Sequence, residues 1–119
     1  MLMGKRGDAK RTWPRGQKFT LSPSGEEAQV AYRDAVLAAR ASGRQALETA
    51  LAGWASPRHV APGDGVVLAE LAGKRLGLPH LCEALESSGI ERAEVRGAID
   101  RLVDAGLVET VPLASQQMN

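Results

Sequence analysis

The fold is decided by residues 78–111, which read LPHLCEALESSGIERAEVRGAIDRLVDAGLVETV. This pattern predicts a helix over 79–86, a turn at 87–89, a second helix over 91–105 and a strand over 107–111. Apolar residues recur at helical spacing in the second helix and predict a buried stripe of Val95, Ala98, Ile99 and Leu102. Gly106 then favours an abrupt exit from the helix, because glycine readily adopts the left-handed conformation in which many helices end.

The residues before this stretch predict one short strand and three more helices. Lys18-Phe19-Thr20-Leu21 alternates as a strand does, and a helix over 24–41 follows, with Ser24 and Glu27 as a capping box. A second helix is expected over 44–55 and ends before Pro57. After a loop at 57–65, Asp64 is expected to cap a third helix over 65–72, and residues 74–77 form a connector.

The spacing of Gly89-Ile90, Val95, Ile99, Leu102 and Gly106-Leu107-Val108 resembles the end of a winged helix-turn-helix domain, a fold of many bacterial transcriptional regulators. The resemblance covers residues 65–111. It implies a mainly α fold with two extra N-terminal helices. The chain departs from the family pattern in two places. The turn over 86–90 is longer than usual, and only eight residues follow Val111, too few for the returning strand of a wing.

The missing strand is expected at the other end of the chain. Residues 18–26, KFTLSPSGE, resemble the segment that usually follows a wing. We therefore expect a small two-stranded sheet in which 18–21 pairs antiparallel with 107–111, either within one chain or between two chains of a strand-sharing dimer. The expected organisation is a basic flexible arm over 1–17, a winged-helix domain with an N-terminal helical extension over 18–112, and a frayed tail over 113–119.

Composition limits the other possibilities. The length of 119 residues fits one domain, and the 44% of hydrophobic residues with only 3% aromatic residues favours a core of Ala, Leu and Val in packed helices. The single cysteine, Cys82, excludes an internal disulfide and is interpreted as a core residue. No apolar run approaches the ~18 residues of a membrane span, and the first residues lack the apolar stretch of a signal peptide. We expect a cytoplasmic protein that does not contact a membrane.

Charge is distributed unevenly along the chain, although the net charge is only +1. Residues 1–18 contain six basic residues and one acidic residue, a net charge of +5. Residues 77–119 contain three arginines and seven acidic residues, a net charge of −4. A basic head of this kind is typical of an arm that contacts nucleic acid, or of a segment that docks on an acidic partner.

The resemblance implies a DNA-binding protein, a small transcriptional regulator whose last helix enters the major groove of double-stranded DNA. Arg92 and Arg96 share one face of that helix and are candidates for contacts with guanine. Other basic residues are candidates for phosphate contacts. The nucleic-acid-binding candidates are Arg92, Arg96, Arg101, Lys74, Arg75, Lys5, Arg6, Lys10, Arg11, Arg15 and Lys18.

A second interpretation is a winged-helix module or adaptor that binds a protein and does not read DNA. Glu91, Glu94, Asp100 and Asp104 lie on the last helix and oppose contact with phosphates. They also have ordinary structural explanations, since acidic residues favour a helix N-terminus and Arg96–Asp100 and Arg101–Asp104 are spaced as surface ion pairs.

Two further sets of residues have two interpretations each. The alanine-rich first helix contacts a second copy of the chain in a homodimer, or packs on its own core; the candidate dimer or partner contacts are Ala28, Ala31, Ala35, Ala38 and Trp54. Trp13 and Phe19 stack on bases, or pack against the body of the domain.

Catalysis is not expected. His59 and His80 are the only histidines, His80 and Cys82 face apart on a helix, and no Cys/His cluster reaches the number of ligands that zinc needs. The chain has no phosphate-binding glycine loop. We therefore expect no enzymatic activity, no cofactor and no metal.

Overall fold

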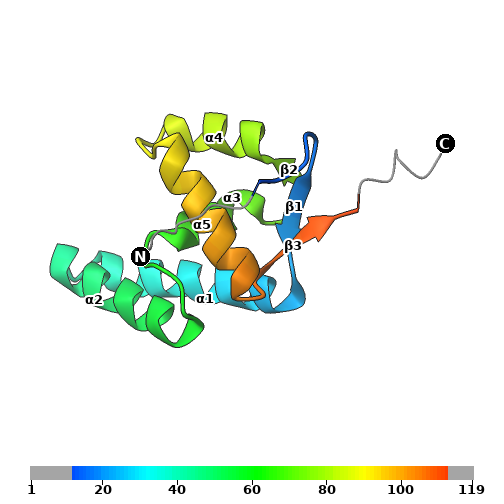
Figure 1. Cartoon of the computed structure of the whole chain (residues 1–119). Helices are drawn as coiled ribbons and strands as arrows, with labels where there is room; N and C mark the ends of the chain where they lie inside the picture. Colours follow the sequence, from blue (N-terminus) through cyan, green and yellow to red (C-terminus); the bar gives the residue numbers. More distant parts are fainter. Residues whose placement is uncertain (1–11, 113–119) are drawn as a thin grey trace, which may run out of the picture.

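The computed structural model describes residues 12–112 of the 119-residue chain. This part is mainly helical, with five α-helices and a small three-stranded antiparallel sheet (Figure 1). Most of the predicted arm, residues 1–11, and the predicted frayed tail at 113–119 lie outside the described residues. In chain order the elements are β1 (Lys18–Leu21), α1 (Pro23–Arg40), α2 (Arg44–Ala55), a 3-10 turn (Ser56–Arg58), α3 (Asp64–Leu71), β2 (Leu76–Gly77), α4 (Leu78–Glu86), α5 (Arg92–Asp104) and β3 (Val108–Val111).

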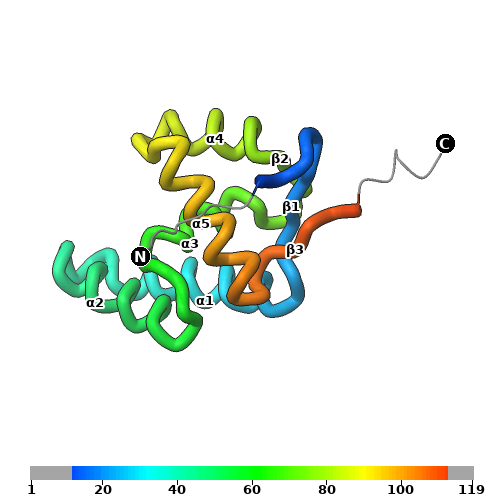
Figure 2. The backbone as a smooth tube through the Cα atoms, in the orientation of Figure 1, coloured from blue at the N-terminus to red at the C-terminus, as the bar shows by residue number. Residues whose placement is uncertain are grey.

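The sheet joins the two ends of the described chain. Its order is β2-β1-β3, and β1 pairs antiparallel with β3 from Leu21 opposite Val108 to Lys18 opposite Val111. The predicted pairing of 18–21 with 107–111 is therefore confirmed, and it forms within one chain. Because Lys18 and Val111 are partners, the start of β1 and the end of β3 lie at the same end of the sheet (Figure 2).

The third strand, β2, lies in the segment that the sequence predicts as a connector. It contains only Leu76 and Gly77, which pair with Phe19 and Lys18 on the free edge of β1. Two residues are too few to show an alternating pattern, so this strand exists only because β1 offers it a hydrogen-bonding edge. The sheet therefore has three strands, where the sequence predicts two.

Ser22 links the start of α1 to the end of α5. Its backbone N–H donates to the carbonyl oxygen of Leu107 at 3.0 Å, and its hydroxyl donates to the carbonyl oxygen of Gly106 at 2.6 Å. The same hydroxyl accepts a hydrogen bond from the N–H of Gly25 at 2.9 Å and so caps α1. The predicted capping box of Ser24 and Glu27 is therefore wrong, because the helix begins two residues earlier than that motif requires.

The core lies where α3, α4 and α5 meet the sheet. The predicted stripe of α5 is confirmed, since Val95, Ala98, Ile99 and Leu102 are all buried. Phe19 from β1 is fully buried in the same cluster. A capping box at the start of α5, in which Glu91 and Glu94 each accept a hydrogen bond from the other's backbone N–H, fixes where this helix begins. The position of α5 is therefore set by its packing and by its cap.

Helices α1 and α2 form a hairpin that packs on α3, at the end of the molecule opposite α4 (Figure 1). The Trp54 indole is buried and its N–H donates to the carbonyl oxygen of Ala28 at 2.9 Å. Its ring also lies edge-on to Tyr32, with centroids 5.1 Å apart.

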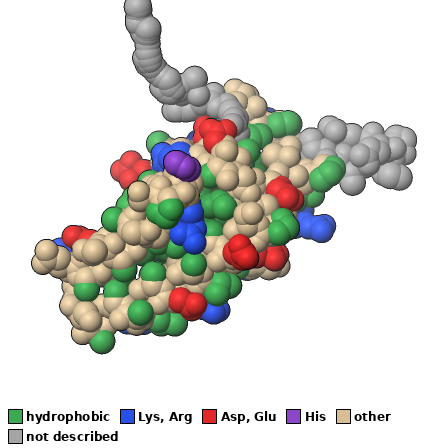
Figure 3. All heavy atoms as spheres, turned by 90° about the horizontal axis from the view of Figure 1, so that it is seen from below, with side chains coloured by type: hydrophobic (Ala, Val, Ile, Leu, Met, Phe, Trp, Pro, Cys, Tyr) green, Lys and Arg blue, Asp and Glu red, His purple; other side chains and the backbone are tan. Residues whose placement is uncertain are grey.

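These contacts correct the predicted dimer surface. Ala28 and Trp54 belong to the core of this chain and are not free to meet a partner; Ala31 and Ala35 are partly buried, and only Ala38 of the predicted set is exposed. The face over α1 and α2 carries interspersed acidic, basic and hydrophobic side chains (Figure 3). The small residues of α1 thus serve the packing within the chain.

Gly25 allows the close approach between α1 and the exit from α5. A Cβ atom at this position would overlap the backbone carbonyl group of Leu107, which belongs to the segment that enters β3. Because the obstacle is backbone and not a flexible side chain, the overlap cannot be relieved by rotation of a side chain.

We predict that Gly25→Ala lowers the free energy of unfolding by about 1–3 kcal/mol, because either α1 or the start of β3 must shift. The matched control is Gly53→Ala in α2, where nothing lies within 4 Å of the added Cβ atom. Alanine favours a helix over glycine by up to about 1 kcal/mol, so the control should be at least as stable as the parent chain. Urea unfolding followed by circular dichroism measures both. Equal stability of Gly25→Ala and the parent would contradict the packing described.

Candidate nucleic-acid interface

Helix α5 carries three arginines, and the structure divides them between its two flanks. Arg92 and Arg96 are exposed and lie one turn apart on the flank that faces α4. Arg101 lies on the opposite flank and is paired with Asp64 of α3. Between the two flanks lie the small residues Ala93, which is exposed, and Gly97, which is partly buried. The three candidates that the sequence grouped together therefore occupy two different environments.

Arg101 holds α5 against α3. Its Nε atom donates to Oδ2 of Asp64 at 2.8 Å and its Nη2 atom donates to Oδ1 at 2.9 Å, a two-point contact with a carboxylate that is only 2% exposed. The backbone N–H of Ala61 also donates to Oδ2 of Asp64. Hydrogen bonding to Asp64 raises the pKa of Arg101 above its ordinary value, so the guanidinium stays charged.

This pair bears on two predictions. Arg101, a candidate for contact with nucleic acid, is 48% exposed, and its guanidinium is engaged by a buried carboxylate of its own chain. Asp64 was expected to cap the third helix, but Gly63 is the cap residue and Asp64 lies in the first turn. Residues 64 and 101 are separated by 37 positions, and nothing in the local sequence of either one indicates the other.

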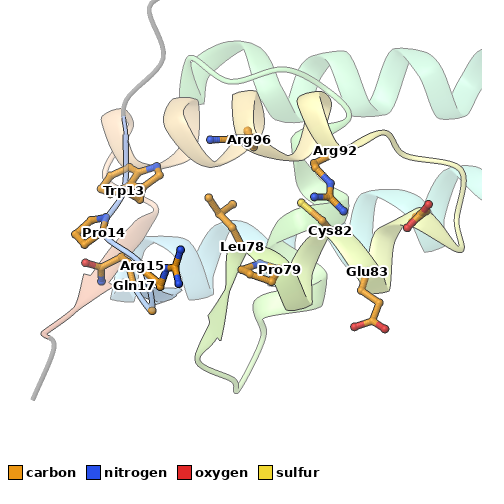
Figure 4. A pocket seen from close by; sticks show the side chains of 12 residues that line it. Trp13, Pro14, Arg15, Gln17, Leu78, Pro79, Cys82, Glu83, Arg92 and Arg96 are labelled. Carbon is orange, nitrogen blue, oxygen red and sulfur yellow. The ribbon is translucent and has the colours of Figure 1, made fainter. Parts of the chain in front are cut away.

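Arg92 and Arg96 line a cavity that we call the α4–α5 cavity (Figure 4). Its volume is about 540 Å³. The segment before β1 forms one side, the start of α4 forms the floor, and α5 forms the remaining side. Figure 4 shows Arg15 and Trp13 on the opposite side of the cavity from Arg92. The lining residues are Trp13, Pro14, Arg15, Gly16, Gln17, Leu78, Pro79, Cys82, Glu83, Glu86, Arg92 and Arg96.

The segment 12–17 is fastened beside this cavity. The side chain of Gln17 donates to the carbonyl oxygens of Val111 at 2.8 Å and Lys18 at 2.9 Å, and a backbone hydrogen bond from Gln17 to Pro14 closes a tight turn. Trp13 is partly buried and lies edge-on to Phe19, with ring centroids 5.1 Å apart. Of the two interpretations of these aromatic residues, the structure confirms the one in which they pack against the body of the domain.

Three arginines from distant parts of the sequence therefore meet around one cavity. Arg15 comes from the segment before β1, whereas Arg92 and Arg96 come from α5, and all three are exposed. Within residues 12–112, no ion pair joins any of the three to a carboxylate, and the expected pair of Arg96 with Asp100 does not form. Their positive charge is available to a ligand.

The other predicted basic residues lie elsewhere or outside the described part. Lys74 and Arg75 are exposed before β2, away from the lining of the cavity, and Lys74 contacts Glu70 at 3.5 Å. Lys18 is exposed at the start of β1. Lys5, Arg6, Lys10 and Arg11 lie outside the described residues. The structure thus gathers three of the eleven candidates at one site.

Acidic residues limit the extent of this positive region. Glu83 and Glu86 of α4 line the cavity, and neither was expected to face Arg92 and Arg96. Glu94 is used in the cap of α5, and one oxygen of Asp100 is buried without a hydrogen-bond partner in the described structure. The position of Glu83 and Glu86 beside the arginines follows from the packing of α4 against α5.

Cys82 lies at the floor of the cavity and is 5% exposed. Burial raises the pKa of its thiol, while the nearby positive charges of Arg92 and Arg96 lower it to a lesser extent.

Among residues 12–112 no group of three or more His, Cys, Asp or Glu side chains could hold a metal ion. No described helix is both long and apolar enough to cross a membrane.

Comparison of the chain with protein-family models, with curated proteins and with solved structures found no match.

We predict that Arg101→Gln destabilises the fold because it leaves the Asp64 carboxylate buried without its partner. Removal of the partner of a buried charge typically lowers the free energy of unfolding by about 3–5 kcal/mol. We expect a decrease near the lower end of this range, because Arg101 itself is half exposed. Arg96→Gln is the matched control and should change the stability by less than about 0.5 kcal/mol. Urea unfolding of both variants measures the difference, and similar stabilities would show that the pair does not hold α5 in place.

We also predict that Cys82 reacts slowly with iodoacetamide at neutral pH in the folded chain, because the thiolate is the reactive form and burial disfavours it. The reaction should accelerate as the pH rises above the ordinary thiol pKa. Because the folded state raises this pKa, the same rise in pH should also lower the stability of the fold. The chain unfolded in urea is the control, and equal rates for folded and unfolded protein at neutral pH would contradict the prediction.

Proposed function

We propose that this chain is a winged-helix protein that binds double-stranded DNA and acts as a small transcriptional regulator. The sheet order supports the fold assignment. In this proposal β2, β1 and β3 form the small sheet of a winged helix, with β1 in the position of the strand that returns from the wing. Helices α3, α4 and α5 are its three helices, and α1 and α2 are an N-terminal extension.

The observation that carries the proposal is the convergence of Arg15, Arg92 and Arg96 around one cavity, with no carboxylate of residues 12–112 paired to them. Charge of this kind attracts phosphates, and guanidinium groups bind phosphate oxygens with two donors. The segment that carries Arg15 is continuous with the basic residues of 1–11. Arg15 and the two arginines of α5 therefore present their positive charge at the same cavity.

The outer strip of α5 determines how the helix meets DNA. Ala93 and Gly97 are small and allow the helix backbone to come close to the floor of a groove. Arg92 and Arg96 lie to one side of this strip, where they reach the phosphates of one strand or a guanine at the groove edge. Arg101 contributes indirectly by fixing the position of α5.

A second function is favoured by the acidic side chains. Glu83 and Glu86 line the cavity beside the arginines, and Asp100 and Asp104 lie further along α5. Such a mixed surface suits a protein partner with complementary charges, as in a winged-helix module or adaptor that does not read DNA. The two functions differ in their response to duplex DNA and to salt.

Fluorescence anisotropy with a labelled random duplex tests the proposal. We expect binding that weakens steeply between about 50 and 200 mM salt, because phosphate contacts release counterions. Arg92→Gln and Arg96→Gln should each lower the affinity by about fivefold to tenfold and reduce the salt slope by about 1. Arg40→Gln, an exposed arginine at the end of α1, is the matched control and should bind like the parent.

Deletion of residues 1–11 measures their contribution to DNA binding without removing any described residue. Under the proposal this deletion lowers the affinity, and the shortened chain still depends on Arg92 and Arg96. The absence of binding at low salt by the full chain would remove the DNA-binding function and leave the protein-interaction module. Binding that is equally sensitive to Arg40→Gln and Arg96→Gln would contradict the assigned interface.

A further inference from the structure

We propose that the α4–α5 cavity is a binding site for a small amphipathic carboxylate, a molecule with one negative charge and an apolar body. The site lies where the segment 13–17 crosses beside the start of α4 and the exposed flank of α5 (Figure 4). Its volume of about 540 Å³ lies within the about 300–1,000 Å³ of typical small-molecule sites. The proposal concerns a ligand other than DNA.

The floor and one wall of the cavity suit the apolar part of such a ligand. Leu78, Pro79 and Cys82 line the cavity from the first two turns of α4 and supply an apolar part of its surface. The indole of Trp13 forms a wall and is held in place by its edge-on contact with Phe19. A planar hydrophobic group placed on this floor is removed from water and contacts the indole, and both effects favour binding.

The charged groups suit one carboxylate. Arg15 lines the cavity from the segment before β1, and Arg92 and Arg96 line it from α5 (Figure 4). A guanidinium binds a carboxylate with two parallel hydrogen bonds, and this geometry distinguishes it from a simple positive charge. No carboxylate of residues 12–112 forms an ion pair with these arginines.

Glu83 and Glu86 set the number of charges that the ligand can carry. Both line the same cavity, so a second negative charge on the ligand would face like charges. A monocarboxylate keeps its single charge at the arginines and places its apolar body over Leu78 and Pro79. The cavity thus favours a monoanion over a free nucleotide or another multiply charged ligand.

The test is a titration of the full-length, ¹⁵N-labelled chain with 2-naphthoate, followed by two-dimensional NMR. We expect saturable shifts of the Trp13 indole N–H and of the backbone amides of Cys82, Arg92 and Arg96. The neutral isostere 2-naphthylmethanol should bind about tenfold more weakly or worse, because it lacks the charge that the arginines recognise. The double variant Arg92→Gln/Arg96→Gln should weaken binding of 2-naphthoate by a similar factor.

Arg40→Gln is the matched control and should bind 2-naphthoate like the parent chain. Arg92 and Arg96 are exposed, so the double variant should keep its fold, and its spectrum in the absence of the probe verifies this. Equal affinity for 2-naphthoate and 2-naphthylmethanol would overturn the proposal, as would shifts confined to the exposed apolar residues Val30 and Leu37 of α1. Absence of saturable binding would overturn it as well. Because the titration contains no DNA, its outcome is independent of the function proposed above.

Discussion

The antiparallel pairing of β1 with β3 is the interaction on which the other features of this molecule depend. It brings Lys18 opposite Val111, and Ser22 extends the connection by hydrogen bonds to Gly106 and Leu107. Because β1 is held there, Phe19 enters the core between the helices and the segment before it is directed toward α4 and α5. Without this pairing Trp13 and Arg15 would have no fixed relation to Arg92, and the cavity would lose one of its sides.

The helices and the main strand pair could be predicted because their signals are local or periodic. Every predicted helix agrees with the structure to within one residue at each end, since apolar spacing, glycines and prolines mark these boundaries. Strand β2 could not be predicted, because two residues carry no alternation. The Ser24–Glu27 motif predicts the wrong cap for α1, because Pro23 at the first helical position favours Ser22 as the cap residue.

The candidate site was predictable in its residue types but not in its arrangement. The sequence identifies Arg92 and Arg96 as neighbours on one helical face, and the structure places both on one cavity. The sequence does not indicate that Arg101 pairs with Asp64, because an ion pair between residues 37 positions apart depends on how α3 packs against α5. The same is true of Glu83 and Glu86, whose position opposite the arginines follows from the packing of α4. Residues of the same type on one helix therefore have different roles that only tertiary contacts decide.

The distribution of charge around the cavity affects the two proposed ligands, DNA and a monocarboxylate, differently. Around the cavity, the positive charge comes from Arg15, Arg92 and Arg96. Acidic residues of α4 line the same cavity, and Asp100 and Asp104 follow along α5. A polyanion gains affinity by many simultaneous contacts, and the described domain offers few of them. The four basic residues of 1–11 then have to supply most of the attraction for DNA, with α5 determining the orientation. A monocarboxylate needs only one two-point contact and an apolar surface, and residues 13–17, α4 and α5 provide both without residues 1–11.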